Sequence, residues 1–207
     1  MKIAILGTGN MGAAFAAELA VTHEVSIGSR DPAKAAALAD TIGAGVVGGG
    51  IAAAVKLSDV VILALPFAAV SDALKQAGDL SGKVLIDITN PVTADFQGLT
   101  IGHLTSAAEE IQAWAPAAKV VKGFNTIFAQ LVAAENRNTQ PLQVFVAADD
   151  ETAKQTAMAL ASSISFKAVD AGPLKNARFL EPVGAMNIQF GFFLGKGPMV
   201  APVWLGL

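Results

Sequence analysis

Hydrophobic residues in this chain form short, β-branched runs that alternate with alanine-rich stretches. The apolar runs predict strands over residues 2–6, 24–27, 60–65, 83–88, 120–124, 143–147 and 166–169. The alanine-rich stretches predict helices over residues 11–20, 32–42, 67–76, 104–114, 127–134 and 151–163. Because this alternation is typical of right-handed βαβ units, we expect an α/β fold built on a doubly wound parallel sheet. The glycine-rich stretch 43–50 is expected to be a loop.

The end of the chain has a different pattern. From residue 179 onward, glycines and prolines alternate with five of the 13 aromatic residues: Phe179, Phe190, Phe192, Phe193 and Trp204. We expect one domain over residues 1–170 and a small C-terminal extension over 171–207, packed on the same domain or on a dimer partner. The aromatic residues either fill a core or form a cap that covers a flat ligand or a second subunit.

The residue composition excludes several kinds of catalytic chemistry. The 207 residues include no cysteine, no tyrosine and two histidines. Without cysteine there is no thiolate nucleophile or Cys-ligated metal, and we expect no metal site. Acid–base catalysis would need His23, His103, a carboxylate, a lysine or water. We expect His23 on the surface and His103 at the start of a helix, so neither is a catalytic candidate.

The net charge and the hydropathy of the chain limit the classes of partner that we expect. The net charge of −3 and the pI of about 5.3 do not indicate a nucleic-acid binder. Mean hydropathy is +0.53, but the longest apolar stretch, 60–70, is about half of a ~20-residue membrane span. The apolar run before Gly7 is too short for a secretion signal. We therefore expect a soluble, cytoplasmic protein whose apolar content lies in a sheet buried on both faces.

A glycine-rich motif follows the first predicted strand. The run Gly7-Thr8-Gly9-Asn10-Met11-Gly12 has the pattern G-x-G-x-x-G and opens a predicted helix. Such glycines allow a tight turn and a close approach of the backbone to a pyrophosphate, while the helix N-terminus offers free N–H groups. The motif predicts a dinucleotide site. A plain strand–helix turn is the alternative.

The end of the second strand bears on which dinucleotide binds. An NAD site usually has an acidic residue there, on the ribose 2′-hydroxyl. This chain has Gly28-Ser29-Arg30 instead, with Lys34 one helical turn later. An arginine, a lysine and a hydroxyl suit a 2′-phosphate, so we predict NADP. We expect the neighbouring Asp31 to cap the following helix, and a solvated Arg/Lys pair remains the alternative.

Two asparagines follow later strands of the sheet. Asn90 precedes Pro91, and it either bonds a ribose or the nicotinamide amide or belongs to an ordinary Asn-Pro turn. Asn125 follows the next strand, near the expected nicotinamide, and Asn125 or Thr126 could instead cap a helix. Because ligands bind beyond the carboxyl ends of parallel strands, these residues belong to the same crevice as the glycine motif.

In this order, the glycine loop, Gly-Ser-Arg, Thr-Asn-Pro and Phe-Asn-Thr resemble the coenzyme F420-dependent NADP oxidoreductase family. The runs 170–174 and 176–178 and the pair Glu181-Pro182 are similar to that family's C-terminal signature. The resemblance covers essentially the whole chain. It implies a Rossmann, NAD(P)-binding fold with a small C-terminal extension, and hydride transfer between NADPH and the deazaflavin F420.

The resemblance also implies roles for individual residues. The adenosine 2′-phosphate would be held by Thr8, Ser29, Arg30 and Lys34. The pyrophosphate would be held by Gly9, Asn10 and Met11, next to Gly7. The rest of the cofactor would lie near Leu65, Pro66, Pro91 and Ala129. Asn125 is the candidate for contact with the acceptor, at a position where archaeal enzymes that use F420 carry histidine.

Because Asn125 stands where those enzymes carry histidine, the sequence is compatible with more than one acceptor. The leading interpretation is an NADP-dependent oxidoreductase acting on F420. A reductase of a flavin, a quinone or a chelated metal is the alternative, and a non-catalytic NADP(H)-sensing module is a third hypothesis. Hydride transfer between two stacked rings depends mainly on their positions, so no catalytic side chain is predicted. We expect a small-molecule acceptor and a homodimer.

Overall fold

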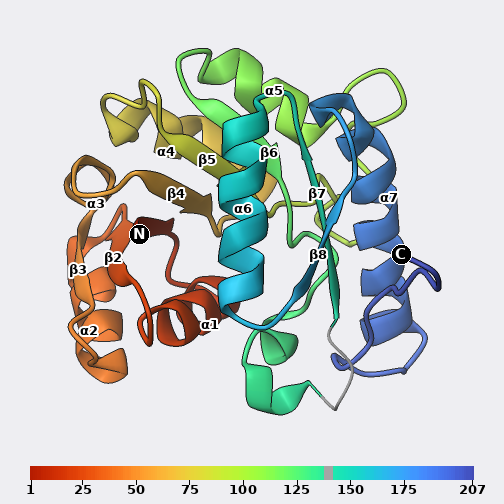
Figure 1. The fold of residues 1–207 in the computed structure, drawn as a ribbon, viewed down its shortest axis with the longest axis horizontal. Helices are drawn as coiled ribbons and strands as arrows, with labels where there is room; N and C mark the ends of the chain where they lie inside the picture. The colour runs from red at the N-terminus through yellow and green to blue at the C-terminus, as the bar shows by residue number, and fades with distance from the viewer. Residues whose placement is uncertain (138–141) are drawn as a thin grey trace.

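The computed structural model describes residues 1–137 and 142–207, and its centre is one eight-stranded sheet (Figure 1). The strand order is β3-β2-β1-β4-β5-β6-β7-β8. The strands are β1 Lys2–Leu6, β2 Glu24–Ser29, β3 Val47–Gly50, β4 Val60–Leu63, β5 Val84–Asp87, β6 Lys119–Lys122, β7 Gln143–Ala148 and β8 Lys167–Asp170. The order reverses beside β1, which makes the edge next to its carboxyl end the topological switch point.

Seven α-helices lie in the described parts of the chain: α1 Asn10–Leu19, α2 Pro32–Ile42, α3 Ile51–Lys56, α4 Val70–Ala77, α5 Ala107–Trp114, α6 Glu151–Ser163 and α7 Ala177–Ile188. Short 3-10 turns lie at η1 Phe67–Ala69, η2 Ala129–Leu131, η3 Ala134–Asn136 and η4 Leu174–Asn176, and a π-helical turn, η5 Gln189–Phe193, follows α7. The predicted doubly wound α/β fold is confirmed.

One pair of neighbouring strands departs from the parallel arrangement. β7 runs antiparallel to β6, with Val121 opposite Ala148. The predicted helix over 127–134 is wrong, because this stretch forms only the turns η2 and η3. A parallel connection needs a crossover of a dozen or more residues, usually a helix. Among the described residues between β6 and β7 there is no crossover helix, and β7 starts at the end of the sheet where β6 finishes.

The glycine-rich stretch also differs from its prediction. Residues 47–50 form the edge strand β3, paired with β2, where we expected only a loop. A Cβ on Gly48 would lie 2.1 Å from the carbonyl oxygen of Ala35. The missing side chain thus lets β3 pack directly on α2. The short helix α3 follows immediately and was not predicted either.

Helices cover both faces of the sheet. One apolar core joins one strand face to α1, α2 and α6, and includes Ile5, Ile27 and Phe15. The second core joins the opposite face to α3, α4 and α5, and includes Leu6 and Leu63. The high apolar content therefore lies in a doubly covered sheet, as predicted. Among the described residues, no helix is long and apolar enough to cross a bilayer.

The C-terminal extension packs on β7, on the face that α6 leaves open (Figure 1). Leu180 of α7 joins Phe145 and Ala147 in a third apolar cluster. Trp204 lies edge-on to Phe145, with ring centroids 5.1 Å apart. The interpretation that the late aromatics fill a core is wrong, because all five are more than two fifths exposed: Phe179, Phe190, Phe192, Phe193 and Trp204.

Candidate functional site

A cleft of about 490 Å³ opens at the topological switch point, where β1, β2 and β4 end. Eight of the predicted cofactor residues line it: Gly7, Thr8, Gly9, Ser29, Arg30, Lys34, Leu65 and Pro66. The remaining wall comes from Gly28, Asp31, Ile51, Ala64, Ala69 and Ala73. Four separate segments of sequence thus meet in one hollow, at the place where open α/β sheets bind their ligands.

Two glycines make the turn at the floor of this cleft possible. Gly7 has φ +126°, and a Cβ there would lie 2.1 Å from the carbonyl oxygen of Ala64. A Cβ on Gly12 would lie 2.1 Å from the carbonyl oxygen of Gly7. The Gly7 N–H donates to the carbonyl oxygen of Gly28 at 2.9 Å, so the turn also joins β1 to β2. Any side chain at Gly7 or Gly12 would force the turn apart.

The N-terminus of α1 is free to bind an anion. Its N-cap residue is Gly9, no side chain caps it, and its first turn contains no acidic residue. No protein atom lies within 4 Å of the position that a Cβ on Gly9 would occupy. Free N–H groups and the positive end of the helix dipole favour a phosphate there. These residues fit the pyrophosphate of a dinucleotide.

Positive charge lines the cleft after the end of β2. Arg30 and Lys34 are both exposed and both line the hollow. Asp31 is the N-cap of α2, and its Oδ1 accepts from the Ala33 N–H at 3.1 Å, as predicted. Ser29 Oγ accepts from the Asp31 N–H at 3.2 Å, and it can still donate its own proton. This donor set fits a 2′-phosphate.

The remaining predicted cofactor residues are not among those that line the cleft. Asn10 and Met11 form the first turn of α1, directly after Gly9. Ala129 begins η2, a turn that packs against α1. Asn90 and Pro91 follow β5, which runs parallel to β4 and ends at the same edge of the sheet.

Asn90 and Asn125 bind each other. The Asn90 side-chain amide donates to the backbone oxygen of Asn125 at 2.7 Å. The Asn125 amide donates to Asn90 Oδ1 at 2.9 Å and to the backbone oxygen of Leu180 at 2.8 Å. Neither Asn125 nor Thr126 caps an α-helix, because none begins there. Asn125 is only 6% exposed, and its Oδ1 accepts no hydrogen bond from the described residues.

A buried ionic cluster under this pair was missed by sequence reasoning. Lys122 Nζ lies 2.8 Å from Asp87 Oδ2, 2.9 Å from Glu181 Oε1 and 2.6 Å from the Thr89 carbonyl oxygen. The three charged side chains are 0–2% exposed. Each of the three ammonium protons of Lys122 therefore has an acceptor. We refer to Asp87, Lys122 and Glu181 as the buried triad.

Glu181 reaches from α7 to the start of α5. Its carboxylate oxygens accept the backbone N–H groups of Ala107 and Ala108 at 2.9 and 3.2 Å. Burial raises the pKa of Glu181, against the opposing effects of Lys122 and of the Ala107 N–H. Ser106, the N-cap of α5, accepts from the Glu109 N–H. The predicted helix start near His103 is wrong, because α5 begins only at Ala107 and His103 lies exposed in the preceding loop.

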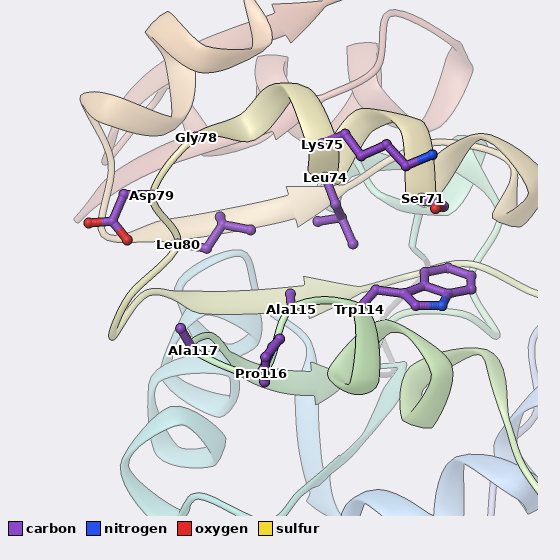
Figure 2. Close-up of a pocket in the computed structure, with 10 residues that line it drawn as sticks. All are labelled: Ser71, Leu74, Lys75, Gly78, Asp79, Leu80, Trp114, Ala115, Pro116 and Ala117. Carbon is purple, nitrogen blue, oxygen red and sulfur yellow. The ribbon is translucent and has the colours of Figure 1, made fainter.

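A second hollow in the surface is lined by none of the predicted cofactor residues. This hollow of about 430 Å³ lies between the end of α4 and the end of α5. Figure 2 shows Leu74 on its α4 side and Trp114 on its α5 side. His23 is partly exposed and contacts Ser163 at 2.9 Å, away from the cleft. Within the described ranges, no group of three or more acidic or histidine side chains could hold a metal ion.

A doubly wound sheet with a glycine turn and a free helix N-terminus at its switch point defines a dinucleotide-binding protein of the Rossmann class. Residues 2–91 match the family described as NADP oxidoreductase, coenzyme F420-dependent. The chain is 32% identical over 204 residues to the F420-dependent NADP reductase of Methanocaldococcus jannaschii, with 91% of each protein covered. The chain belongs to this family, and its class is that of the NADP-dependent oxidoreductases.

Other similar proteins match different shares of this chain and of their own length. The structure of a candidate F420-dependent NADP-reductase from Arthrobacter sp. FB24 matches with a TM-score of 0.85 and 33% identity, over 94% of this chain and 95% of that one. Metalloreductase STEAP3 of Rattus norvegicus is 31% identical over 183 residues, 88% of this chain. The chain spans only 36% of the rat protein's length. An imine reductase from Aspergillus terreus, at 23% identity and TM-score 0.68, shares the fold.

Proposed function

We propose that this protein transfers a hydride between NADPH and a planar acceptor, with coenzyme F420 as the first candidate. The observation that supports this most is that a free helix N-terminus and two exposed cations, Arg30 and Lys34, belong to one cleft. The pyrophosphate suits the helix end and the 2′-phosphate suits the cations. When bound, NADPH supplies the hydride itself.

In this proposal, the protein holds NADPH and the acceptor and orients them toward each other. Thr8, Ser29, Arg30 and Lys34 would bind the 2′-phosphate, and Gly7, Gly9, Asn10 and Met11 would lie along the pyrophosphate. Leu65, Pro66, Asn90, Pro91 and Ala129 would border the rest of the cofactor. Catalysis would come from keeping donor and acceptor carbons about 3–3.5 Å apart and aligned. This needs neither the absent tyrosine nor an accessible histidine.

Asn125 is the proposed contact with the acceptor. Its Nδ2 hydrogens are both used, by Asn90 and by Leu180. Its Oδ1 has no partner among the described residues, so it can still accept a hydrogen bond from a ring N–H or an amide. A carboxamide oxygen accepts in the same way from a deazaflavin or a flavin. The acceptor must therefore be found by assay.

The test is NADPH oxidation at 340 nm with purified protein and a set of acceptors: F420, FMN, a quinone and a ferric chelate. Oxidation with F420 alone is the expected result. Oxidation only with another acceptor would replace F420 but keep the hydride-transfer class. The similarity to the metalloreductase makes the ferric chelate the most informative of the alternatives. NADPH binding without oxidation of any kind would favour an NADP(H)-sensing module.

We also propose a cytoplasmic homodimer in which the C-terminal extension packs on a second copy. Large apolar side chains are exposed close together in sequence there, among them Phe192, Phe193, Leu194 and Met199. Exposed apolar clusters of this kind mark interaction surfaces more often than solvated ones. Sedimentation of the wild type and of Phe192→Ser/Phe193→Ser tests this. A wild-type monomer, or an unchanged dimer in the variant, would contradict it.

A further inference from the structure

Two polar contacts from neighbouring residues of α7 hold this helix on the sheet. The backbone oxygen of Leu180 accepts the Asn125 side-chain amide at 2.8 Å. The carboxylate of Glu181, the next residue, lies 2.9 Å from Lys122 Nζ and binds the first N–H groups of α5. One point of the fold thus joins the ends of β5 and β6, the start of α5, and α7.

The same helix lies directly on the asparagine pair. A Cβ on Gly184 would lie 2.4 Å from Asn90 Oδ1 and 2.8 Å from the backbone oxygen of Asn125. Gly184 follows Glu181 by one turn of α7, so the ionic contact fixes where its bare backbone meets the pair. A small shift of α7 would move Asn90 and Asn125 together.

We propose that Asp87, Lys122 and Glu181 are positioning residues that fix α7 against the ends of β5 and β6, and thereby fix the orientation of Asn90 and Asn125 toward the nicotinamide and the acceptor. This inference rests on the proposed function. The triad touches neither the cleft lining nor a predicted cofactor residue through its charged atoms. It acts through the asparagine pair.

Stability alone does not explain why an ionic group lies here. A buried ion pair loses the hydration of both charges, and well-packed apolar residues often replace one without loss of stability. Hydrogen bonds give something that apolar packing does not, because each ammonium N–H donates, and each carboxylate oxygen accepts, best within a limited range of distances and angles. Seven polar partners converge at this point: three charged groups, the Thr89 carbonyl oxygen, and the N–H groups of Thr89, Ala107 and Ala108.

The experiment uses the full chain with Glu181→Gln, which keeps the size of the side chain and removes its charge. A charge-free triple variant, Asp87→Asn/Lys122→Met/Glu181→Gln, keeps the test valid if the single variant folds poorly. Glu109→Gln is the matched control, because Glu109 also joins α5 to α7, through two hydrogen bonds to Arg178 near the surface.

Three measurements separate positioning from simple stabilisation. Calorimetry gives the NADPH dissociation constant, the emission of bound NADPH reports the surroundings of its nicotinamide, and steady-state kinetics with the active acceptor give kcat and KM. We expect the triad variants to bind NADPH within about twofold of wild type. Their kcat falls at least tenfold, and the nicotinamide emission shifts. Glu109→Gln leaves all three unchanged.

The outcomes are distinguishable from those of the proposed function. If folded triad variants keep both the wild-type kcat and the wild-type emission, the positioning role is wrong. An equal loss of NADPH affinity and of kcat also overturns it, because that pattern shows a general loss of the folded state. If the wild type reduces no acceptor, the proposed function fails, and the emission of bound NADPH alone then decides the role of the triad.

Discussion

The two ends of the site are built in opposite ways. The end formed by the glycine turn, Arg30 and Lys34 consists of residues close in sequence, and its charged side chains are exposed. The end formed by Asn90, Asn125 and the buried triad joins residues up to 94 positions apart, from Asp87 to Glu181, and its charges are buried. After the positions proposed for NADPH, we call these the phosphate end and the nicotinamide end.

Because of this difference, we expect the two ends to affect different properties of the protein. These are NADPH affinity at the phosphate end and fold stability at the nicotinamide end. An exposed cation can contribute to ligand affinity while adding little to the stability of the fold. A buried charge whose partner is removed destabilises the whole chain. Substitution of the exposed cations at the phosphate end should therefore weaken NADPH binding and leave unfolding nearly unchanged. Substitutions in the buried triad should destabilise the fold and leave NADPH binding nearly unchanged.

The largest effect is expected for Lys122→Met. Removing the ammonium leaves Asp87 and Glu181 facing each other without a cation in a site that excludes water. Breaking such a group costs about 3–5 kcal/mol of unfolding free energy. Urea unfolding followed by circular dichroism measures it. A loss below 1 kcal/mol would mean that water reaches the site, and the comparison between the two ends would fail.

Arg30→Ala tests the opposite end. Losing charge-assisted hydrogen bonds to a 2′-phosphate should weaken NADPH binding by about 1.5–3 kcal/mol, roughly ten- to 150-fold. NADH, which lacks that phosphate, should bind as it does to wild type. The unfolding free energy should change by less than about 0.5 kcal/mol, since Arg30 is exposed. Calorimetry with both nucleotides checks this, and equal losses for the two would refute the 2′-phosphate role.

Two glycines offer a matched pair of substitutions. Gly184→Ala places a methyl group 2.4 Å from Asn90 Oδ1, and overpacking of this kind costs about 1–3 kcal/mol of stability. Gly9→Ala meets no protein atom within 4 Å, so its cost should stay below about 1 kcal/mol. It should instead weaken NADPH binding, because the methyl group enters the space proposed for the pyrophosphate. Thermal unfolding and calorimetry of both variants would show whether the effects separate in this way.

The same contrast explains what could be predicted from the sequence. The phosphate end depends on local patterns: an apolar strand, a glycine turn, and a basic residue after the next strand. Asp31 could be predicted as a helix cap because Pro32 follows it, and the structure bears this out. The choice between core and surface for the late aromatics depended on the path of α7, which no local pattern gives, and the core interpretation was wrong.

The buried triad could not be assembled from sequence, although a signal was present. Asp87 and Lys122 are the last residues of β5 and β6 and directly follow buried apolar residues of those strands, and a buried charge needs a partner. Adjacent parallel strands place these two side by side, since Asp87 pairs with Lys122 in the register of β5 and β6. The third member, Glu181, comes from a helix that was not predicted. Its partnership depends entirely on tertiary packing.

The smallest expected effect is a difference in pH dependence between two glutamates that join α5 and α7. Burial raises the pKa of Glu181 above its ordinary value of 4.5, whereas hydrogen bonds from Arg178 lower the pKa of Glu109 below it. The folded chain therefore holds the Glu181 proton more tightly than the unfolded chain does. Its contribution to stability is complete below pH 4.5 and is lost as pH rises through the folded pKa. The contribution of Glu109 is present above pH 4.5 and is lost as pH falls through its lowered pKa.

Urea unfolding from about pH 3 to 8, comparing wild type with Glu181→Gln and with Glu109→Gln, should give difference curves of opposite slope. Two curves of the same sign would show that the Glu181 carboxylate is hydrated like its surface counterpart, and would remove the contrast between a buried and an exposed connection of the same two helices.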